Sequence, residues 1–265
     1  MCQFFEVSRS GYYDYVCRLG NPERDATLAK LIGEQQAHCG HTYGYRRIWL
    51  WLKTVRKIQR NPKTILRIMK KYELLAEVRR RKRWRQMGQQ IHRYENLLNR
   101  EFHANCPNSK WVTDISYIHT QQGILYLSMI RDLYDNSIVA YKTGTQQTVN
   151  LVLDTIRLAV KREKKTIAAE LQLHSDQGLQ YTSHEYFNLT KEYGITPSMS
   201  RRGNCYDNAM AENFFSILKT ECIYRHKPKT LVEAKMLIDD YIYFYNHERI
   251  QLKSGLTPFA LRQSA

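Results

Sequence analysis

The first third of the chain places hydrophobic residues three and four positions apart, the spacing at which side chains share one face of an α-helix. One such run begins at Asp25, and a second covers residues 44–53. A third is predicted to begin with Asn61 as its N-cap and Pro62 as its first helical residue. Its hydrophobic stripe is Ile65, Ile68, Met69 and Tyr72, and its other side carries Lys63, Arg67, Lys70 and Lys71. Short helices with a basic exposed face favour an all-α unit of the helix-turn-helix type.

From residue 110 the pattern changes to short runs rich in Val, Ile, Tyr, Trp and Thr, which are typical of strands. The predicted strands are Lys110–Ile118, Gly123–Leu133, Asn136–Lys142, Leu171–Ser175 and Ile195–Ser200. The predicted helices are Val149–Arg162, His184–Tyr193, Asp207–Glu221 and a last one that opens with the capping box Thr230–Glu233. This order predicts an α/β fold with a mixed five-stranded sheet, the order of the ribonuclease H-like fold. We therefore expect a basic helical region with its linker over 1–109, and a ribonuclease H-like core with a C-terminal helix over 110–265.

The net charge of +16 is concentrated in the predicted helical region. Residues 1–109 hold 22 Lys and Arg against 9 Asp and Glu, whereas residues 110–265 hold 19 against 16. Such an imbalance indicates a polyanionic partner, and double-stranded DNA fits a helix-turn-helix unit. The basic run at 79–85 is expected to contact phosphates. The candidate DNA contacts are Arg46, Arg47, Lys63, Arg67, Lys70, Arg79, Arg80, Arg81, Lys82 and Arg83.

The sequence gives no sign of export or of a membrane span. No stretch is long and apolar enough to cross a bilayer, and the N-terminus lacks the basic and apolar segments of a secretory signal. The six cysteines are scattered, with no Cys-x-x-Cys pair, as is usual for free thiols in a reducing compartment. We expect a cytoplasmic protein without a membrane partner.

Three acidic residues stand at positions where a carboxylate could take part in binding or catalysis. Asp114 lies inside an apolar strand, where a carboxylate is costly unless it is paired, hydrogen-bonded or bound to a metal. Asp176 directly follows a predicted strand, at the end where ligand sites of α/β sheets gather. Glu212 follows after 35 intervening residues, within a helix whose predicted polar stripe also holds Asn208, Ser216 and Lys219. We interpret Asp207 as the N-cap of that helix.

The sequence around these acids resembles a known family. The segments Trp111–Tyr117, His174–Tyr181 and Ser200–Glu212 are similar to the three signature blocks of DDE-type insertion-sequence transposases, relatives of the retroviral integrases. The gap of 35 residues matches that superfamily, and Lys219 matches its basic position after the Glu. Further matching segments are Ser8–Tyr13, Tyr43–Ile48, Tyr245–Arg249 and Gly255–Pro258. Gln251 departs from the pattern, because many members carry a His there.

The resemblance implies a catalytic mechanism. Asp114, Asp176 and Glu212 would hold two Mg²⁺ ions, with Asp114 bridging both and Mn²⁺ able to substitute. The expected reactions are hydrolysis at the element's end, which frees a 3′-OH, and attack of that 3′-OH on another phosphodiester. Lys219 would bind phosphate near the cut, and His174 would either shape the site or serve a structural role.

The resemblance also implies partners: double-stranded DNA, as the element's terminal inverted repeats and the target, and further copies of the chain in a dimer or larger assembly. In the best-known relatives an upstream reading frame adds a DNA-binding segment by frameshifting, and the start of this chain is consistent with a second-frame product.

Two alternative functions remain open from the residues. A non-catalytic DNA-binding regulator explains the basic half but not the acids, and a ribonuclease H-like nuclease explains the acids but not the helical arm.

Overall fold

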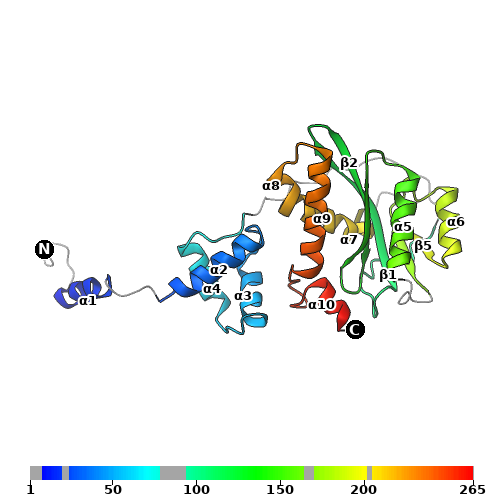
Figure 1. Cartoon of the computed structure of the whole chain (residues 1–265). Helices are drawn as coiled ribbons and strands as arrows, with labels where there is room; N and C mark the ends of the chain where they lie inside the picture. Colours follow the sequence, from blue (N-terminus) through cyan, green and yellow to red (C-terminus); the bar gives the residue numbers. More distant parts are fainter. Residues whose placement is uncertain (1–7, 20–23, 78–93, 164–169, 202–204, 265) are drawn as a thin grey trace. The chain divides into compact units, whose positions relative to one another are not determined.

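The computed structural model describes residues 8–19, 24–77, 94–163, 170–201 and 205–264, and the chain divides into two compact units, 1–77 and 78–265 (Figure 1). The helices of the first unit are α1 (Arg9–Leu19), α2 (Ala26–His38), α3 (Tyr45–Thr54) and α4 (Pro62–Lys71). The described helices of the second unit are α5 (Val149–Glu163), α6 (His184–Glu192), α7 (Ala209–Leu218), α8 (Tyr224–His226), α9 (Leu231–His247) and α10 (Pro258–Gln263). Its strands are β1 (Lys110–Thr120), β2 (Gly123–Asp132), β3 (Ile138–Gly144), β4 (Gln172–Ser175) and β5 (Thr196–Met199).

Helices α2, α3 and α4 of the first unit form a small bundle. The Asn61 side chain accepts a hydrogen bond of 2.8 Å from the Lys63 N–H, and Pro62 opens α4, so the predicted start of this helix is confirmed. The hydrophobic stripe of α4 is fully buried at Ile65, Ile68 and Met69, against Ile48, Trp51 and Leu52 on the buried side of α3. Burial of these matched apolar faces holds the short helices together.

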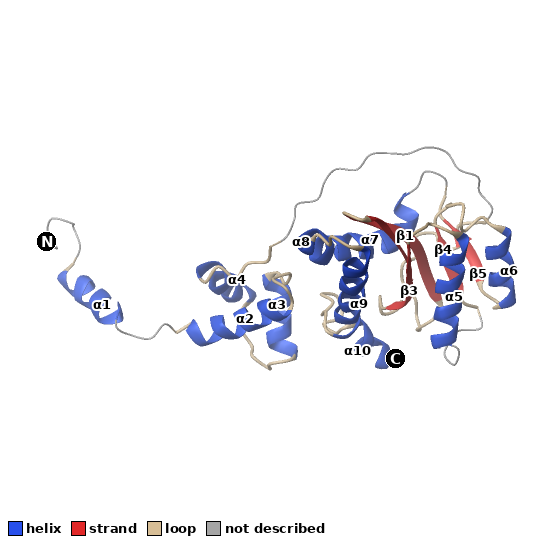
Figure 2. Ribbon diagram, turned by 45° about the horizontal axis from the view of Figure 1, so that its top comes forward, coloured by secondary structure: helices blue, strands red, loops and turns tan. Residues whose placement is uncertain are grey.

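The second unit is built on a five-stranded mixed sheet in the order β3-β2-β1-β4-β5. β1, β2 and β3 form an antiparallel meander, whereas β4 pairs in parallel with both β1 and β5. Helices cover both faces of the sheet (Figure 2). One apolar core lies between the sheet and α7 and α9, and a second lies on the face covered by α5 and α6. This arrangement confirms the predicted fold.

Two features differ from the sequence-based expectation. The segment before β1, which we assigned to the first region, belongs to the second unit, because Leu98 and Ala104 are buried in the core beside α7 and α9. The single helix expected over 207–221 is divided into a 3₁₀ turn (Cys205–Asn208), α7 and a π-helical turn (Lys219–Ile223). No helix within the described ranges has both the length and the apolar character needed to cross a membrane.

Candidate active site

Asp114 and Asp176 meet because β1 and β4 run in parallel. The register pairs Trp111 with Leu173 and Val112 with His174, and β4 ends one residue before Asp176. Continuing this register by two residues puts Asp176 beside Asp114. Each carboxylate is partly buried and accepts one backbone hydrogen bond, from the Ile115 N–H at 2.7 Å and from the Gly178 N–H at 2.9 Å.

Glu212 comes to the same place from α7, which packs on β1. Ala211, Phe214, Phe215 and Leu218 are the buried residues of this helix. Their burial turns the partly exposed Glu212 toward the edge of that core, near the end of β4.

The pKa values of the three acids report their mutual proximity. Burial raises the pKa of Asp114 well above its ordinary range, and repulsion by Asp176 and Glu212 raises it further. The pKa of Glu212 is raised by burial and by Asp176, and that of Asp176 is raised by burial. None of the three forms an ion pair with another described residue. The fold therefore brings together three acidic groups that repel one another when ionised and that have no ion-pair partner among the described residues.

The chemistry of this donor set fits magnesium better than a softer metal. Within the described parts of the chain, no group of three His, Cys, Asp or Glu side chains stands ready as a complete metal site. Mg²⁺ does not need one, because it keeps several waters and is usually bound through a few carboxylates together with substrate phosphates. Carboxylates that have no ion-pair partner among the described residues are the oxygen ligands that such an ion would use.

Lys219 is the cation that faces this acidic group. Its Nζ lies 4.8 Å from the centre of the Tyr117 ring, and Tyr117 itself is exposed on β1. Burial lowers the pKa of Lys219, while attraction to Asp114 opposes that decrease. The ring holds the ammonium group near the acids without neutralising it.

Two further residues shape the site and were missed from sequence alone. A Cβ added at Gly178 would lie 3.0 Å from Oδ1 of Asp176, so glycine allows the close approach of the backbone N–H. Tyr181 is fully buried, its hydroxyl lies 3.3 Å from that of Thr113, and burial beside Asp114 and Asp176 raises its pKa. Both lie in the quoted motif, but no local pattern assigned them a role.

Comparison with known proteins identifies related domains in both units of the chain. Models of an integrase core domain match residues 104–205 and 212–265, and a model of an HTH-like domain matches residues 23–83. The chain is 38% identical over 258 residues to the putative transposase InsK for insertion sequence element IS150 of Escherichia coli K12, covering 97% of this chain and 90% of that protein. It is 31% identical over 238 residues to the transposase InsF for insertion sequence IS3A of the same strain, covering 84% and 78%. The chain belongs to the IS3-family insertion-sequence transposases.

A solved structure shows the same fold. A chain of the simian T-cell lymphotropic virus intasome, in complex with PP2A regulatory subunit B56 gamma, superposes with a TM-score of 0.54 at 14% identity. The match covers 82% of the transposase and 74% of that chain. At this identity the likeness concerns the architecture, an integrase-like core preceded by helices.

His174 of the transposase is held between two serine hydroxyl groups. It is fully buried, with Nδ1 2.8 Å from the Ser198 hydroxyl and Nε2 3.2 Å from the Ser200 hydroxyl. Burial lowers its pKa to about 4, so the ring is neutral near pH 7. Of the two roles left open by the sequence, these contacts favour the structural one.

Asp207 is not the N-cap of α7, contrary to the sequence-based interpretation. Asn208 holds that position without a side-chain capping bond. Asp207 is buried and instead accepts hydrogen bonds from Asn96, Arg100 and the Arg201 N–H, at 2.8, 3.2 and 3.0 Å. It ties the segment before β1 to the turn that precedes α7. Asn208 is also buried, so it does not belong to an exposed polar stripe.

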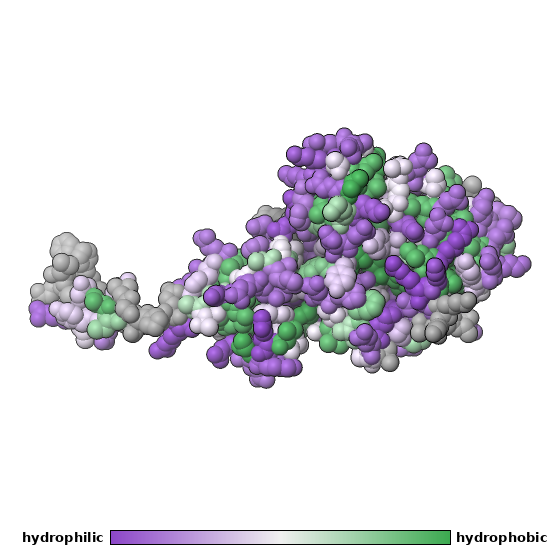
Figure 3. Space-filling view, in the orientation of Figure 1, coloured by the Kyte–Doolittle hydropathy of each residue, from purple (hydrophilic) through white to green (hydrophobic). Residues whose placement is uncertain are grey.

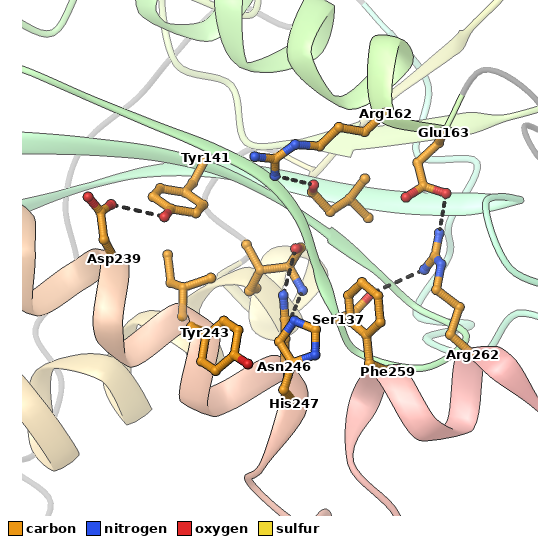
Figure 4. A pocket seen from close by; sticks show the side chains of 13 residues that line it. Ser137, Tyr141, Arg162, Glu163, Asp239, Tyr243, Asn246, His247, Phe259 and Arg262 are labelled. Carbon is orange, nitrogen blue, oxygen red and sulfur yellow. Dashed lines mark hydrogen bonds and ion pairs between the residues drawn. The ribbon is translucent and has the colours of Figure 1, made fainter.

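Asp132 and Asp135 belong to a separate acidic cluster. Arg262 of α10 forms ion pairs with both, at 3.2 and 2.7 Å, and with Glu163 at 2.9 Å. Arg262 also lines a pocket of about 490 Å³ between β3, α5, α9 and α10, which none of the three candidate catalytic acids lines (Figure 4).

The candidate DNA contacts of the first unit are mostly exposed. Figure 3 shows hydrophilic residues over much of its visible face. Lys63 and Lys70 are exposed on α4. Arg67 is exposed as well, but it forms an ion pair of 2.8 Å with Asp25. On α3, Arg46 is exposed beside Tyr45, and Arg47 lies over the Tyr43 ring. The predicted contacts Arg79, Arg80, Arg81, Lys82 and Arg83 lie outside the described residues.

Proposed function

We propose that this transposase cleaves the ends of its insertion sequence and joins the freed 3′ ends to target DNA, using divalent metal ions. The observation that carries the proposal is the convergence of Asp114, Asp176 and Glu212, whose raised pKa values reflect burial and repulsion and which lack an ion-pair partner among the described residues. A stable fold gains nothing from uncompensated carboxylates, so their arrangement points to a function.

The three carboxylates would together bind two Mg²⁺ ions. When bound, the ions would supply activation of the attacking oxygen and stabilisation of the leaving oxygen. Asp114 is expected to be central to this site because it faces repulsion from both other acids. Lys219 would hold a DNA phosphate beside the acids, since its ammonium is kept there by Tyr117 rather than by an ion pair.

The proposed reaction has two steps of the same kind. Water attacks the phosphorus at the element's end, the bond between phosphorus and the 3′ oxygen breaks, and that oxygen leaves as a 3′-OH. This 3′-OH then attacks a phosphorus of another strand and displaces that strand's 3′ oxygen. No covalent enzyme intermediate is needed, so the protein's task is to position the DNA and balance charge.

The first unit would bind the element's ends. Its exposed basic side chains on α3 and α4 follow the pattern of helix-turn-helix proteins, and the run at 79–85 would contact phosphates without reading sequence.

Replacing Arg79, Arg80, Arg81, Lys82 and Arg83 by Ala should weaken binding to every sequence and flatten its salt dependence, whereas Lys70→Ala should change sequence preference. Fluorescence anisotropy over a salt series separates the two effects. Unchanged salt dependence in the fivefold variant would remove the basic run from the interface.

Joining needs two element ends, or an end and a target, in one assembly, so we propose at least a dimer on DNA. Light scattering of the protein bound to paired ends tests this. A single protomer in the joined product would contradict it.

The test of the proposed activity is a cleavage and joining assay on duplexes that carry the native element's ends. Products are expected with Mg²⁺ or Mn²⁺, and binding with little chemistry is expected with Ca²⁺. Binding without products in Mg²⁺ would favour a regulator. Cleavage without joining, or cleavage of DNA–RNA hybrids in preference to the ends, would favour a nuclease.

A further inference from the structure

A buried arginine, Arg131, lies beneath α7. It is 4% exposed and stands on β2, where the register pairs it with Val112, while Met129 pairs with Asp114. Alternate residues of a strand share a face, so Arg131 and Asp114 point to the same side of the sheet. This is the side covered by α7 and α9.

The contacts of Arg131 join three parts of the core. Nη1 donates a hydrogen bond of 2.6 Å to the carbonyl of Met210, which lies in the first turn of α7, two residues before Glu212. Nη2 donates to Asn136 Oδ1 at 3.0 Å and to the Tyr245 hydroxyl at 3.2 Å. These acceptors are neutral oxygens, and Arg131 forms no ion pair with any described carboxylate.

Stability alone does not explain this arrangement. A buried guanidinium is costly unless a carboxylate compensates it. A positive charge beside the first turn of a helix also opposes the helix dipole. What Arg131 provides is geometry, because its planar, rigid donors fix the Met210 carbonyl relative to β2. That contact fixes the distance of α7 from the paired strands β1 and β2. It therefore fixes the position of Glu212 relative to Asp114 on β1.

A second layer holds Arg131 itself. Asn136 has a positive φ of 66° in the turn between β2 and β3, and its Nδ2 donates a hydrogen bond of 2.9 Å to Gln251 Oε1. Gln251 Nε2 donates in turn to the carbonyl of Asp135. Gln251, the residue that departs from the family's usual His, is thus a support for this chain of contacts.

We propose that Arg131 is a positioning residue that sets Glu212 for metal binding, with Asn136, Tyr245 and Gln251 as its supports. The inference rests on the proposed function, since it takes Glu212 as a metal ligand. Removing such a support behind a ligand commonly weakens metal binding by about 10–100-fold.

The experiment measures Mn²⁺ binding by the full chain, from the loss of the free-ion electron paramagnetic resonance signal, together with the melting temperature. Arg131→Met should weaken Mn²⁺ binding about tenfold, and Arg131→Lys should recover part of that loss. In a Glu212→Gln background Arg131→Met should cause no further weakening, because the residue through which it acts is already changed. A general loss of stability would not be abolished by Glu212→Gln.

Two more variants complete the design. Tyr245→Phe removes one acceptor of Arg131 and keeps the ring that packs on Phe214, so a smaller weakening is expected even where Arg131→Met does not fold. Arg162→Met is the matched control, because Arg162 also donates to a backbone carbonyl, that of Val139, but on α5. It should bind Mn²⁺ as the wild type does.

Wild-type affinity in both Arg131→Met and Tyr245→Phe, or equal weakening with and without Glu212→Gln, would overturn the inference. Wild-type affinity in Glu212→Gln alone would instead refute Glu212 as a ligand, and with it the proposed function.

Discussion

The second unit contains two groups of three carboxylates that differ in one respect, namely whether a described cation forms ion pairs with them. Asp132, Asp135 and Glu163 share one cation, Arg262, which also donates to Asn108 and to the Ser137 hydroxyl. Asp114, Asp176 and Glu212 have no ion pair among the described residues, and Lys219 faces them without a bond. The first group is compensated by its ion pairs with Arg262, which hold α10 to the sheet, although burial and repulsion by Asp135 still raise the pKa of Asp132 to about 6. The second group is uncompensated by any described cation.

The compensated group should show the largest effect on stability. Arg262→Met removes the cation that pairs with the buried Asp132 and Asp135, and breaking a buried pair of this kind typically costs about 3–5 kcal/mol. Urea denaturation should therefore show a lower free energy of unfolding, with or without Mg²⁺. A loss below about 1 kcal/mol would mean that this group is not held by Arg262.

Divalent ions should stabilise the protein through the uncompensated group only. At a free Mg²⁺ concentration a hundred times its Kd, binding adds about 2.7 kcal/mol to the free energy of unfolding. The wild type and Arg262→Met should gain equally, and Asp114→Asn should gain much less. An equal gain in Asp114→Asn would place the ion elsewhere.

Without metal, the uncompensated group should cost stability. Asp114→Asn keeps the shape of the side chain and removes the charge that Asp176 and Glu212 repel. In EDTA at neutral pH it should raise the free energy of unfolding by about 0.5–2 kcal/mol, the usual size of a stabilising substitution. Destabilisation under these conditions would show that the carboxylate supports the fold.

An exposed acid should show the smallest effect. Asp154 pairs with Arg157 on α5, and both side chains are more than half exposed. Asp154→Asn should change the free energy of unfolding by less than about 0.5 kcal/mol, with or without Mg²⁺. A larger change would undermine the use of this variant as a neutral control.

Much of the fold could be predicted because its signals are local. The α4 start at Asn61 and Pro62, the hydrophobic stripe behind them and the strand runs from residue 110 each depend on neighbours within one or two turns. Asp114 and Asp176 could be recognised for the same reason, since Asp114 lies within an apolar strand and Asp176 directly follows one. Parallel pairing of β1 and β4 then brings them together.

The rest depends on contacts between distant parts of the chain. Arg131 reaches Tyr245, and Arg262 reaches Asp132, across more than a hundred residues, and no local pattern predicts such partners. Asp207 is of a residue type common at helix N-caps, but it accepts hydrogen bonds from Asn96 and Arg100 in the segment before β1. The same packing moves the boundary between the units to residue 77.

We propose that the uncompensated acids carry the chemistry of this transposase. The direct test is the single-turnover rate of strand transfer in Mg²⁺ by Asp176→Asn, compared with the wild type and Asp154→Asn on the same element-end DNA. Asp176→Asn should fold and bind the DNA, yet join it at least about a thousandfold more slowly, while Asp154→Asn keeps the wild-type rate. Strand transfer by Asp176→Asn near the wild-type rate would contradict the account.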